Sequence, residues 1–319
     1  MRPIKRVILT GGTGAIGMAL IKKCIENNIA VLIIANPNSE RNSRLYQWLE
    51  HDSDLIEIVE CDMTSYNSLC FNKTYDAWFH LAWMGASGKG RDDMHLQNKN
   101  VSCMLDAVDA AKKAGCLVFV GAGSQAEYGP YDRKIKETDA TNPQMGYGIA
   151  KLCAGQMGRM MTKETDMDFV WTRIFSVYGP YDGPNTMISS GISALLAGKT
   201  ASFTMGEQQW DYLYSEDAAH MLLMLAQKGA GGNVYNIGSG MTRTLAEYIE
   251  VFAKEIGKKE FVSLGAIPYG SNTLMHLAAD LSKYCQEIEN IQLTPFEEGI
   301  RNTIQWMKEE YERPEVEGR

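Results

Sequence analysis

The chain has 319 residues, 45% of them hydrophobic and 22% charged, which is enough to bury a large core in one large domain or two modest ones. Its net charge of −8 argues against the basic face that a nucleic-acid-binding protein needs. No apolar run approaches the ~20 residues that cross a bilayer, so no membrane-spanning helix is expected.

The cysteines and the N-terminus indicate the compartment. The seven cysteines are scattered and form no C-x-x-C pair, which is typical of reduced thiols and favours neither a metal site nor a disulfide framework. The basic residues Arg2, Lys5 and Arg6 precede only a short apolar stretch, so no secretory signal is expected. We therefore expect a soluble cytoplasmic protein without metal, nucleic-acid or membrane partners.

An apolar strand at 7–10 breaks into glycines and resumes as a helix. Gly11, Gly14 and Gly17 would permit a sharp turn, a close approach of the backbone to a pyrophosphate, and close packing of helix on strand. The phosphates would face the free N–H groups of the helix N-terminus. A glycine-rich turn also occurs at ordinary strand-to-helix corners, but its place directly after the first strand favours cofactor binding. The predicted contacts are Gly11, Thr13, Gly14, Ala15, Ile16 and Gly17.

A second buried strand at 30–35 ends in a polar loop. Enzymes that prefer NAD place an acid there for the ribose 2′-hydroxyl, whereas this chain has Asn36, followed by Arg41 and Arg44. A missing acid with nearby guanidinium groups suits the 2′-phosphate of NADP(H), so we predict NADP(H) over NAD(H). The alternative is a solvated loop whose arginines touch no cofactor.

Further apolar stretches at 55–62, 75–82 and 116–121 alternate with helical segments, one of them passing through Asn100 and closing at Gly115. This alternation predicts βαβ units and a doubly wound parallel α/β sheet. Asp62 ends the third strand, where it could meet the adenine amine. His80 ends the fourth, where we favour a hydrogen-bonded structural role over catalysis.

Tyr147 and Lys151 are four residues apart on a predicted helix, so their side chains share one face. A free phenol titrates near ~10, too high for a base at neutral pH. A neighbouring ammonium group favours the phenolate and lowers that pKa, which would suit Tyr147 to acid–base catalysis. Ser124, at the end of the fifth strand, could hydrogen-bond the same substrate oxygen.

Together these motifs resemble, from end to end, the extended short-chain dehydrogenase/reductase family of nucleotide-sugar epimerases, dehydratases and reductases. The matching segments are 10–17, Asp62, 80–82, Asn100, 124–129, Tyr147 with Lys151, 173–180, 235–240 and 294–299. The resemblance implies a Rossmann domain, in which Ser124, Tyr147 and Lys151 are catalytic. The tyrosine moves a proton at the sugar hydroxyl or ketone while nicotinamide moves a hydride at the same carbon, and the lysine also holds the nicotinamide ribose.

The resemblance also implies further contacts and an assembly. Met63, Leu81, Ala82 and Asn100 join the cofactor-binding set, together with Tyr147 and Lys151. The implied substrate-binding residues are Trp83, Ser124, Gln125, Ala126, Arg173, Ser176 and Trp210. A homodimer is implied through the helix after Asn100 and the helix of Tyr147.

The chain departs from the family pattern at several positions. Gln125 and Ala126 stand where sugar 4,6-dehydratases have Asp-Glu, which removes the acid and base for water elimination and excludes a dehydratase. Ser176 replaces the usual asparagine, and Trp210 stands where an arginine normally meets the diphosphate. A second family arginine is missing around 269–272. Candidates to replace these guanidinium groups are Arg173, Lys199 and Arg243.

We expect a dinucleotide-binding Rossmann domain at 1–178 and 208–238, and a substrate-binding lobe at 179–207 and 239–319 with a loose polar tail at 313–319. The predicted function is an NADP(H)-dependent reductase of a 4-keto-6-deoxy nucleotide sugar in deoxysugar or polysaccharide biosynthesis. Hydride goes to C4, with Tyr147 as the acid. One alternative is a nucleotide-sugar 4-epimerase with tightly bound NAD, and another is a non-catalytic cofactor-sensing protein on the same fold.

Overall fold

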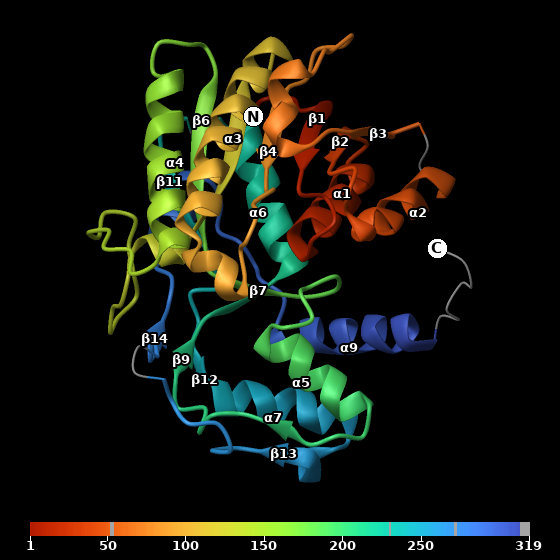
Figure 1. Cartoon of the computed structure of the whole chain (residues 1–319), viewed down its shortest axis with the longest axis vertical. Coiled ribbons are helices and arrows are strands. Elements are labelled where there is room, and N and C mark those ends of the chain that lie inside the picture. Colours follow the sequence, from red (N-terminus) through yellow and green to blue (C-terminus); the bar gives the residue numbers. More distant parts are fainter. Residues whose placement is uncertain (52–53, 230, 271–272, 313–319) are drawn as a thin grey trace.

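A parallel sheet with helices on both faces forms the larger part of the computed structural model, which describes residues 1–51, 54–229, 231–270 and 273–312 (Figure 1). Within these ranges the sheet has seven strands, in the order β11-β6-β5-β4-β1-β2-β3. The strands are β1 (Arg6–Thr10), β2 (Ala30–Ala35), β3 (Ile56–Glu60), β4 (Ala77–His80), β5 (Val118–Ser124), β6 (Asp168–Ile174) and β11 (Val234–Ile237). The order reverses between β1 and β4, and such a switch point opens a ligand crevice at the carboxyl ends of the strands. The predicted doubly wound α/β fold is confirmed.

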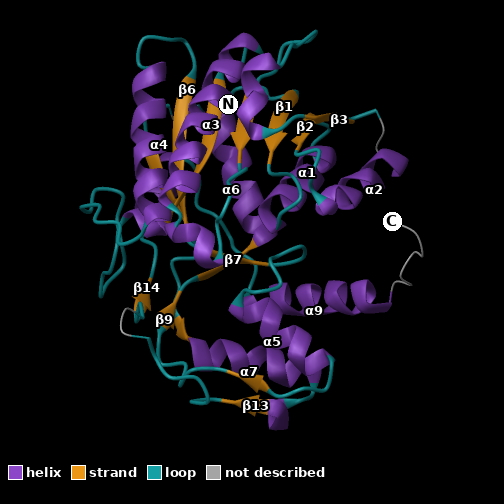
Figure 2. Ribbon diagram, in the orientation of Figure 1, coloured by secondary structure: helices purple, strands orange, loops and turns teal. Residues whose placement is uncertain are grey.

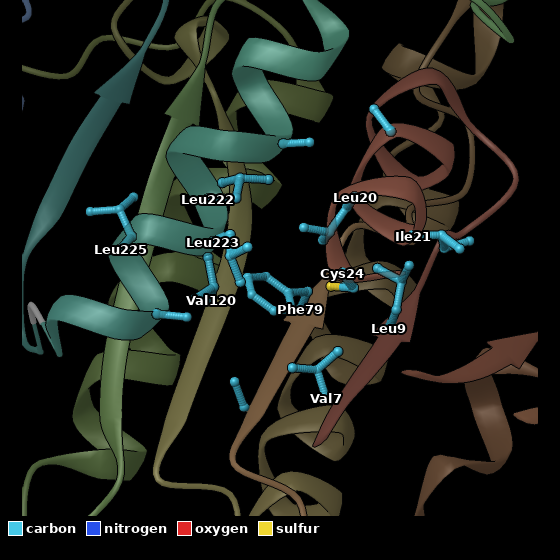
Figure 3. Close-up of a cluster of buried hydrophobic side chains, with 14 of the residues drawn as sticks. Val7, Leu9, Leu20, Ile21, Cys24, Phe79, Val120, Leu222, Leu223 and Leu225 are labelled. Carbon is cyan, nitrogen blue, oxygen red and sulfur yellow. The ribbon is translucent and has the colours of Figure 1, made fainter. Parts of the chain in front are cut away.

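Helices α1 (Ala15–Glu26) and α6 (Ser215–Lys228) pack together on one face of the sheet. Figure 3 shows their apolar side chains meeting those of the central strands. Val7 and Leu9 point into this core while Ile8 points into the core on the other face, as the two-residue period of a strand requires. That second core lies beneath α3 (Met94–Lys113) and α4 (Gly146–Thr162). The central strands are therefore buried on both faces. This packing fixes the positions of the carboxyl ends of β1 and β5.

The smaller lobe lies below the sheet in Figure 1 and consists mainly of helices. It contains α5 (Met187–Leu196), α7 (Leu245–Ile256) and α9 (Phe296–Glu312), which share an aromatic core. Its short strands are β8 (Ala201–Ser202), β9 (Gln209–Trp210), β12 (Arg243–Thr244), β13 (Val262–Ser263) and β14 (His276–Leu277). Figure 2 labels β9, β13 and β14 among them. The paired strands β7 (Ser176–Tyr178) and β10 (Tyr212–Tyr214) connect the lobe to the large sheet.

Three features differ from the expected organisation. Strand β9 pairs with β12 and β14 of the lobe, although its residues fall in the range assigned to the larger domain. Helix α8 (Ser282–Glu287) returns from the lobe to the large core, because Tyr284 and Ile288 pack beneath α6 and β11. A helix absent from the sequence interpretation, α2 (Ser43–His51), follows β2. The expected tail at 313–319 and the positions 271–272 lie outside the described residues.

Among the described residues, no helix combines the length and the apolar composition that crossing a membrane requires.

Candidate functional site

One cavity of about 420 Å³ joins the glycine turn to Ser124, Tyr147 and Lys151 at the carboxyl ends of the central strands. Gly11, Gly14 and Ala15 line one end, and the three predicted catalytic side chains line the other. The remaining lining residues are Ile16, Gly17, Leu81, Trp83, Ala86, Arg91, Ala122, Gly123, Gln125, Ile174, Phe175, Ser176, Val177 and Asp182. The structure therefore brings together two motifs that lie more than a hundred residues apart in the sequence.

The glycine turn has the geometry of a phosphate cradle. Gly11 adopts φ +80°, and a Cβ there would lie 2.6 Å from the backbone of Leu81 and Ala82. A Cβ at Gly17 would overlap the carbonyl of Gly11, so this glycine lets α1 pack closely on the turn. Gly14 is different, because no atom lies within 4 Å of its ideal Cβ position and no side chain caps the N-terminus of α1. The first N–H groups of α1 thus open toward free space, which fits the pyrophosphate of a dinucleotide.

Tyr147 lies at the start of α4, between an aromatic ring and a guanidinium group. The Trp83 ring meets it edge-on, with centroids 6.2 Å apart, and the Arg91 guanidinium carbon lies 4.5 Å from its ring centroid. Burial raises the pKa of the Tyr147 phenol above its usual value, while a hydrogen bond with Ser124 and the charge of Arg91 oppose that rise. The protonated phenol is therefore the resting form, and it shares a hydrogen bond with the predicted partner Ser124.

Lys151 is buried one turn further along α4. Its Nζ donates a hydrogen bond of 2.5 Å to the Ala122 carbonyl and lies 3.7 Å from the centroid of the Trp83 ring. Burial lowers its pKa to about 7, so the ammonium group is easily deprotonated near neutral pH. Arg91 is a cation whose charge opposes the rise in the Tyr147 pKa. That Lys151 has the same effect stays a prediction.

Ser124 ends β5 and caps the short helix η4 (Gln125–Glu127). Its hydroxyl accepts a hydrogen bond from the Ala126 N–H, and its own N–H donates to the Glu127 carboxylate at 2.9 Å. That carboxylate also accepts hydrogen bonds from Trp171 and Arg173, at 3.0 Å and 2.8 Å. The segment that carries Ser124 is thus tied to the core by a buried network.

Two predicted contacts are structural. Arg173 is only 6% exposed, pairs with Glu127 and stacks on the Tyr128 ring at 4.3 Å, so its guanidinium is enclosed and unavailable to a substrate. Asn100 is fully buried. Its side-chain amide accepts a hydrogen bond from the Met84 N–H and donates one to the Met84 carbonyl. We correct both assignments: Arg173 anchors the Ser124 segment, and Asn100 positions the loop after β4.

Several other predicted residues do not line the cavity. Trp210 donates a hydrogen bond of 2.8 Å to the hydroxyl of Ser176, which does line the cavity. Met63 and Ala82 pack in the core beneath α3. One carboxylate oxygen of Asp62 accepts two hydrogen bonds from Thr64. His80 is buried, with its Nδ1 in a hydrogen bond to Thr10 and burial lowering its pKa to about 3, which fits the structural role favoured for it.

The replacement cations suggested for the diphosphate lie elsewhere. Arg243 forms a salt bridge with Glu297 in the lobe. Lys199 is exposed just after α5. Neither lines the cavity that holds Tyr147.

A second cavity of about 870 Å³ extends outward from the first, and the two share Arg91 and Gln125. The loop before β14 and the segment after η4 line it; its other residues are Asp92, Ala126, Gly129, Pro130, Tyr131, Asp132, Gln144, Met145, Thr273, Leu274, Met275 and His276. Sequence interpretation missed Arg91 and also Asp182, which lines the inner cavity. A basic residue in the glycine-rich loop that follows Trp83 was the available signal for Arg91.

A model of the NAD dependent epimerase/dehydratase family matches residues 7–238. A curated relative, dTDP-glucose 4,6-dehydratase of Salmonella typhimurium, is 25% identical over 94% of this chain and 92% of its own length. The UDP-N-acetylglucosamine 4-epimerase of Methanobrevibacter ruminantium, solved with UDP-N-acetylmuramic acid, has a TM-score of 0.85 at 23% identity, covering 97% of this chain and all of its own. The UDP-glucuronic acid 4-epimerase of Bacillus cereus, solved with UDP-glucuronic acid and NAD, has a TM-score of 0.84 at 22% identity, covering 96% of this chain and all of its own.

The predicted preference for NADP(H) is wrong. The matching family is described as NAD dependent, and the similar solved structures that name a dinucleotide contain NAD. In the structure, the Arg44 guanidinium donates to the Thr13 carbonyl at 3.1 Å and to the Tyr181 carbonyl at 3.4 Å. Asn36 accepts hydrogen bonds within its own loop: its side-chain oxygen from the Asn38 N–H, and its carbonyl from the Asn42 side-chain amide.

The family match over most of the chain agrees with the cradle at Gly14 and with the cavity that joins it to Tyr147. The chain therefore belongs to the NAD dependent epimerase/dehydratase family of enzymes.

Proposed function

We propose that the protein is an NAD-dependent 4-epimerase of a nucleotide-linked sugar. The observation that carries the proposal is the single cavity with an open phosphate cradle at one end and Ser124, Tyr147 and Lys151 at the other. A wider second cavity adjoins this catalytic end and offers room for the rest of a sugar nucleotide. The acid–base steps of 4-epimerisation need no side chains beyond Ser124, Tyr147 and Lys151.

In the proposed reaction, the phenol of Tyr147 first loses its proton to solvent. The resulting phenolate takes the proton of the sugar C4 hydroxyl and later returns it to the C4 oxygen. NAD, when bound at Gly14 and the N-terminus of α1, supplies the acceptor and donor of the C4 hydride. Ser124 hydrogen-bonds Tyr147 and the same sugar oxygen. It thereby positions that oxygen for proton transfer to and from Tyr147. Lys151 binds the cofactor ribose, and the charge of Arg91 favours the phenolate when the proton leaves.

The 4,6-dehydratase reaction of several relatives is disfavoured by the side chains after Ser124. Gln125 and Ala126 provide neither acid nor base there. Glu127 is enclosed by Arg173 and Trp171. Asp182, the one carboxylate among the described residues that line the inner cavity, accepts hydrogen bonds from Gly183, Thr186 and Ser189. Among the described residues that line the inner cavity, no carboxyl group is therefore left without hydrogen-bond partners to eliminate water.

A contact of Arg44 beside the glycine turn supports the proposal of epimerisation over net reduction. Arg44 of α2 joins the carbonyl of Thr13, in the glycine turn, to the carbonyl of Tyr181, in the loop between β7 and α5. The same guanidinium lies 5.5 Å from the centroid of the Tyr181 ring. An epimerase regenerates its cofactor in each cycle, so a bridge that slows cofactor exchange suits it, whereas a reductase must exchange the cofactor at every turnover.

We also propose a cytoplasmic homodimer formed through α3 and α4. Helix α4 exposes Ile149, Met157 and Met160, an apolar stripe at helical spacing that a partner helix would cover. Sedimentation equilibrium tests this, and a monomer at every concentration would contradict it.

The test of function is epimerisation without added cofactor. Purified protein is incubated with UDP- and dTDP-hexoses in deuterated water, and the configuration at C4 is followed by NMR. We expect the C4 epimer to accumulate without deuterium at C4, since the hydride returns to the carbon that it left. Turnover only of a 4-keto sugar with added NADH would identify a reductase instead, and no turnover would favour the non-catalytic alternative.

A further inference from the structure

Arg91 occupies the junction between the two cavities. It lies in the short helix η3 (Gly88–Asp92), between β4 and α3, and lines both the inner cavity and the outer one. Its guanidinium lies over the ring of Tyr147, 4.5 Å from the centroid. Arg91 therefore lies beside Tyr147 and also borders the outer cavity.

The Arg91 side chain is held without being neutralised. Its Nε donates to the sulfur of Met145 at 3.1 Å, which fixes the stem and leaves the two terminal nitrogens for another partner. No carboxylate pairs with Arg91 within the described ranges 1–51, 54–229, 231–270 and 273–312. Its acidic neighbour Asp92 instead accepts a hydrogen bond from the Gly146 N–H. The stem of Arg91 is thus held by Met145, and no described carboxylate forms a salt bridge with its guanidinium group.

Arg91 is also one of three residues lining the two cavities, among those described, that can carry a positive charge. Among the described residues that line the two cavities, the others that can carry one are Lys151 and His276. Burial lowers the pKa of Lys151 to about 7, and its Nζ is already bonded to Ala122. A guanidinium group stays protonated at any physiological pH and matches two oxygen atoms at once.

We propose that Arg91 is the anion-recognition residue of this site and binds a pair of oxyanion oxygens of the substrate. This inference rests on the proposed function, since it concerns the sugar nucleotide that Tyr147 acts on. The shared ligand chemistry is a phosphate or carboxylate oxygen pair, supplied either by the diphosphate or by an acidic substituent on the sugar.

The experiment compares binding by wild type, Arg91→Met and Arg91→Lys using isothermal titration calorimetry. The ligands are UDP, UDP-glucose and UDP-glucuronic acid, which separate the diphosphate from a sugar carboxylate. Arg301→Met is the matched control, because Arg301 is exposed on α9 and lines neither cavity. Bound NAD and far-UV circular dichroism are measured on every variant to establish that the fold and the cofactor site are retained.

We expect Arg91→Met to weaken binding roughly 10- to 100-fold, because a charge-assisted hydrogen-bond pair is lost. Arg91→Lys should recover part of that loss, and Arg301→Met should bind like wild type. Weakening for all three ligands identifies the diphosphate as the source of the oxygens, and weakening confined to UDP-glucuronic acid identifies the carboxylate. Unchanged binding of every ligand in Arg91→Met, or no binding by wild type, would overturn the inference.

The proposed function can fail independently of this result. Wild-type protein that binds these ligands through Arg91 but forms no C4 epimer would contradict epimerisation and leave the recognition role intact.

Discussion

The indole N–H of Trp210 donates a hydrogen bond of 2.8 Å to the hydroxyl of Ser176, and this bond links strand β9 of the lobe to β7 at the cavity wall. These are two of the positions at which the chain departs from the family pattern. The Trp210 carbonyl also accepts a hydrogen bond from Tyr248 of α7. Trp210 therefore contacts both β7 and α7, and these two bonds hold the lobe against the sheet.

A double-mutant cycle tests that link. Ser176→Ala and Trp210→Phe each remove one partner, and the double variant removes both. We expect a coupling energy of about 0.5–1.5 kcal/mol, the usual net contribution of one hydrogen bond, measured from urea unfolding. Strictly additive losses of stability would show that the two residues act separately.

Tyr147→Phe should retain bound NAD and lose turnover by on the order of 10²–10⁴-fold, because it keeps the ring and removes the proton carrier. Tyr269→Phe is the matched control. Its hydroxyl accepts a hydrogen bond from the Glu207 N–H, and Tyr269 lines neither cavity. Equal activity of Tyr147→Phe and wild type would remove Tyr147 from the reaction.

The buried Lys151 should make stability depend on pH. Its pKa is lowered to about 7 in the folded protein and is about 10.4 in the unfolded chain, so the unfolded state binds more protons between these values. The stability of wild type relative to Lys151→Met should therefore rise with pH across this window, with a slope of up to about 1.4 kcal/mol per pH unit. Below the folded pKa both states bind the proton, so the difference should level off.

Urea unfolding of both proteins at matched NAD content, from about pH 6 to about pH 10, measures this dependence. Parallel stability profiles would mean that Lys151 keeps an ordinary pKa in the folded state.

Arg173→Met should destabilise the fold by about 3–5 kcal/mol, because it leaves the Glu127 carboxylate buried without its cation. The exposed pair of Arg133 with Asp139 offers a control, and Arg133→Met should unfold close to wild type. Glu127→Gln in the Arg173→Met background should recover much of the loss, since no charge then remains buried. A small effect of Arg173→Met alone would return Arg173 to the candidates for substrate binding.

The parts of the site that could be predicted from the sequence depend on local spacing. The turn of Gly11, Gly14 and Gly17 lies within one βα unit, and Tyr147 and Lys151 lie one helical turn apart. Ser124 was predictable because it directly follows a buried strand.

The parts that could not be predicted depend on contacts between distant segments. Arg44 is held by Tyr181, 137 residues away, so a guanidinium that suggested a 2′-phosphate is already in use. Arg173 pairs with Glu127, 46 residues away, and is buried by that pairing. Arg91 reaches Tyr147 only because the loop after β4 folds over the start of α4, which no local pattern specifies.

The most direct test of the central claim is the identity of the dinucleotide that the protein carries. Freshly purified protein is denatured, and the released cofactor is quantified by enzymatic cycling for NAD(H) and NADP(H) separately. We predict that the protein carries a stoichiometric amount of NAD(H) and that this NAD(H) stays bound during dialysis. We also expect Arg44→Met to release it more readily. Protein that carries no NAD(H), and neither binds it nor epimerises any nucleotide hexose when NAD⁺ is added, would contradict the account.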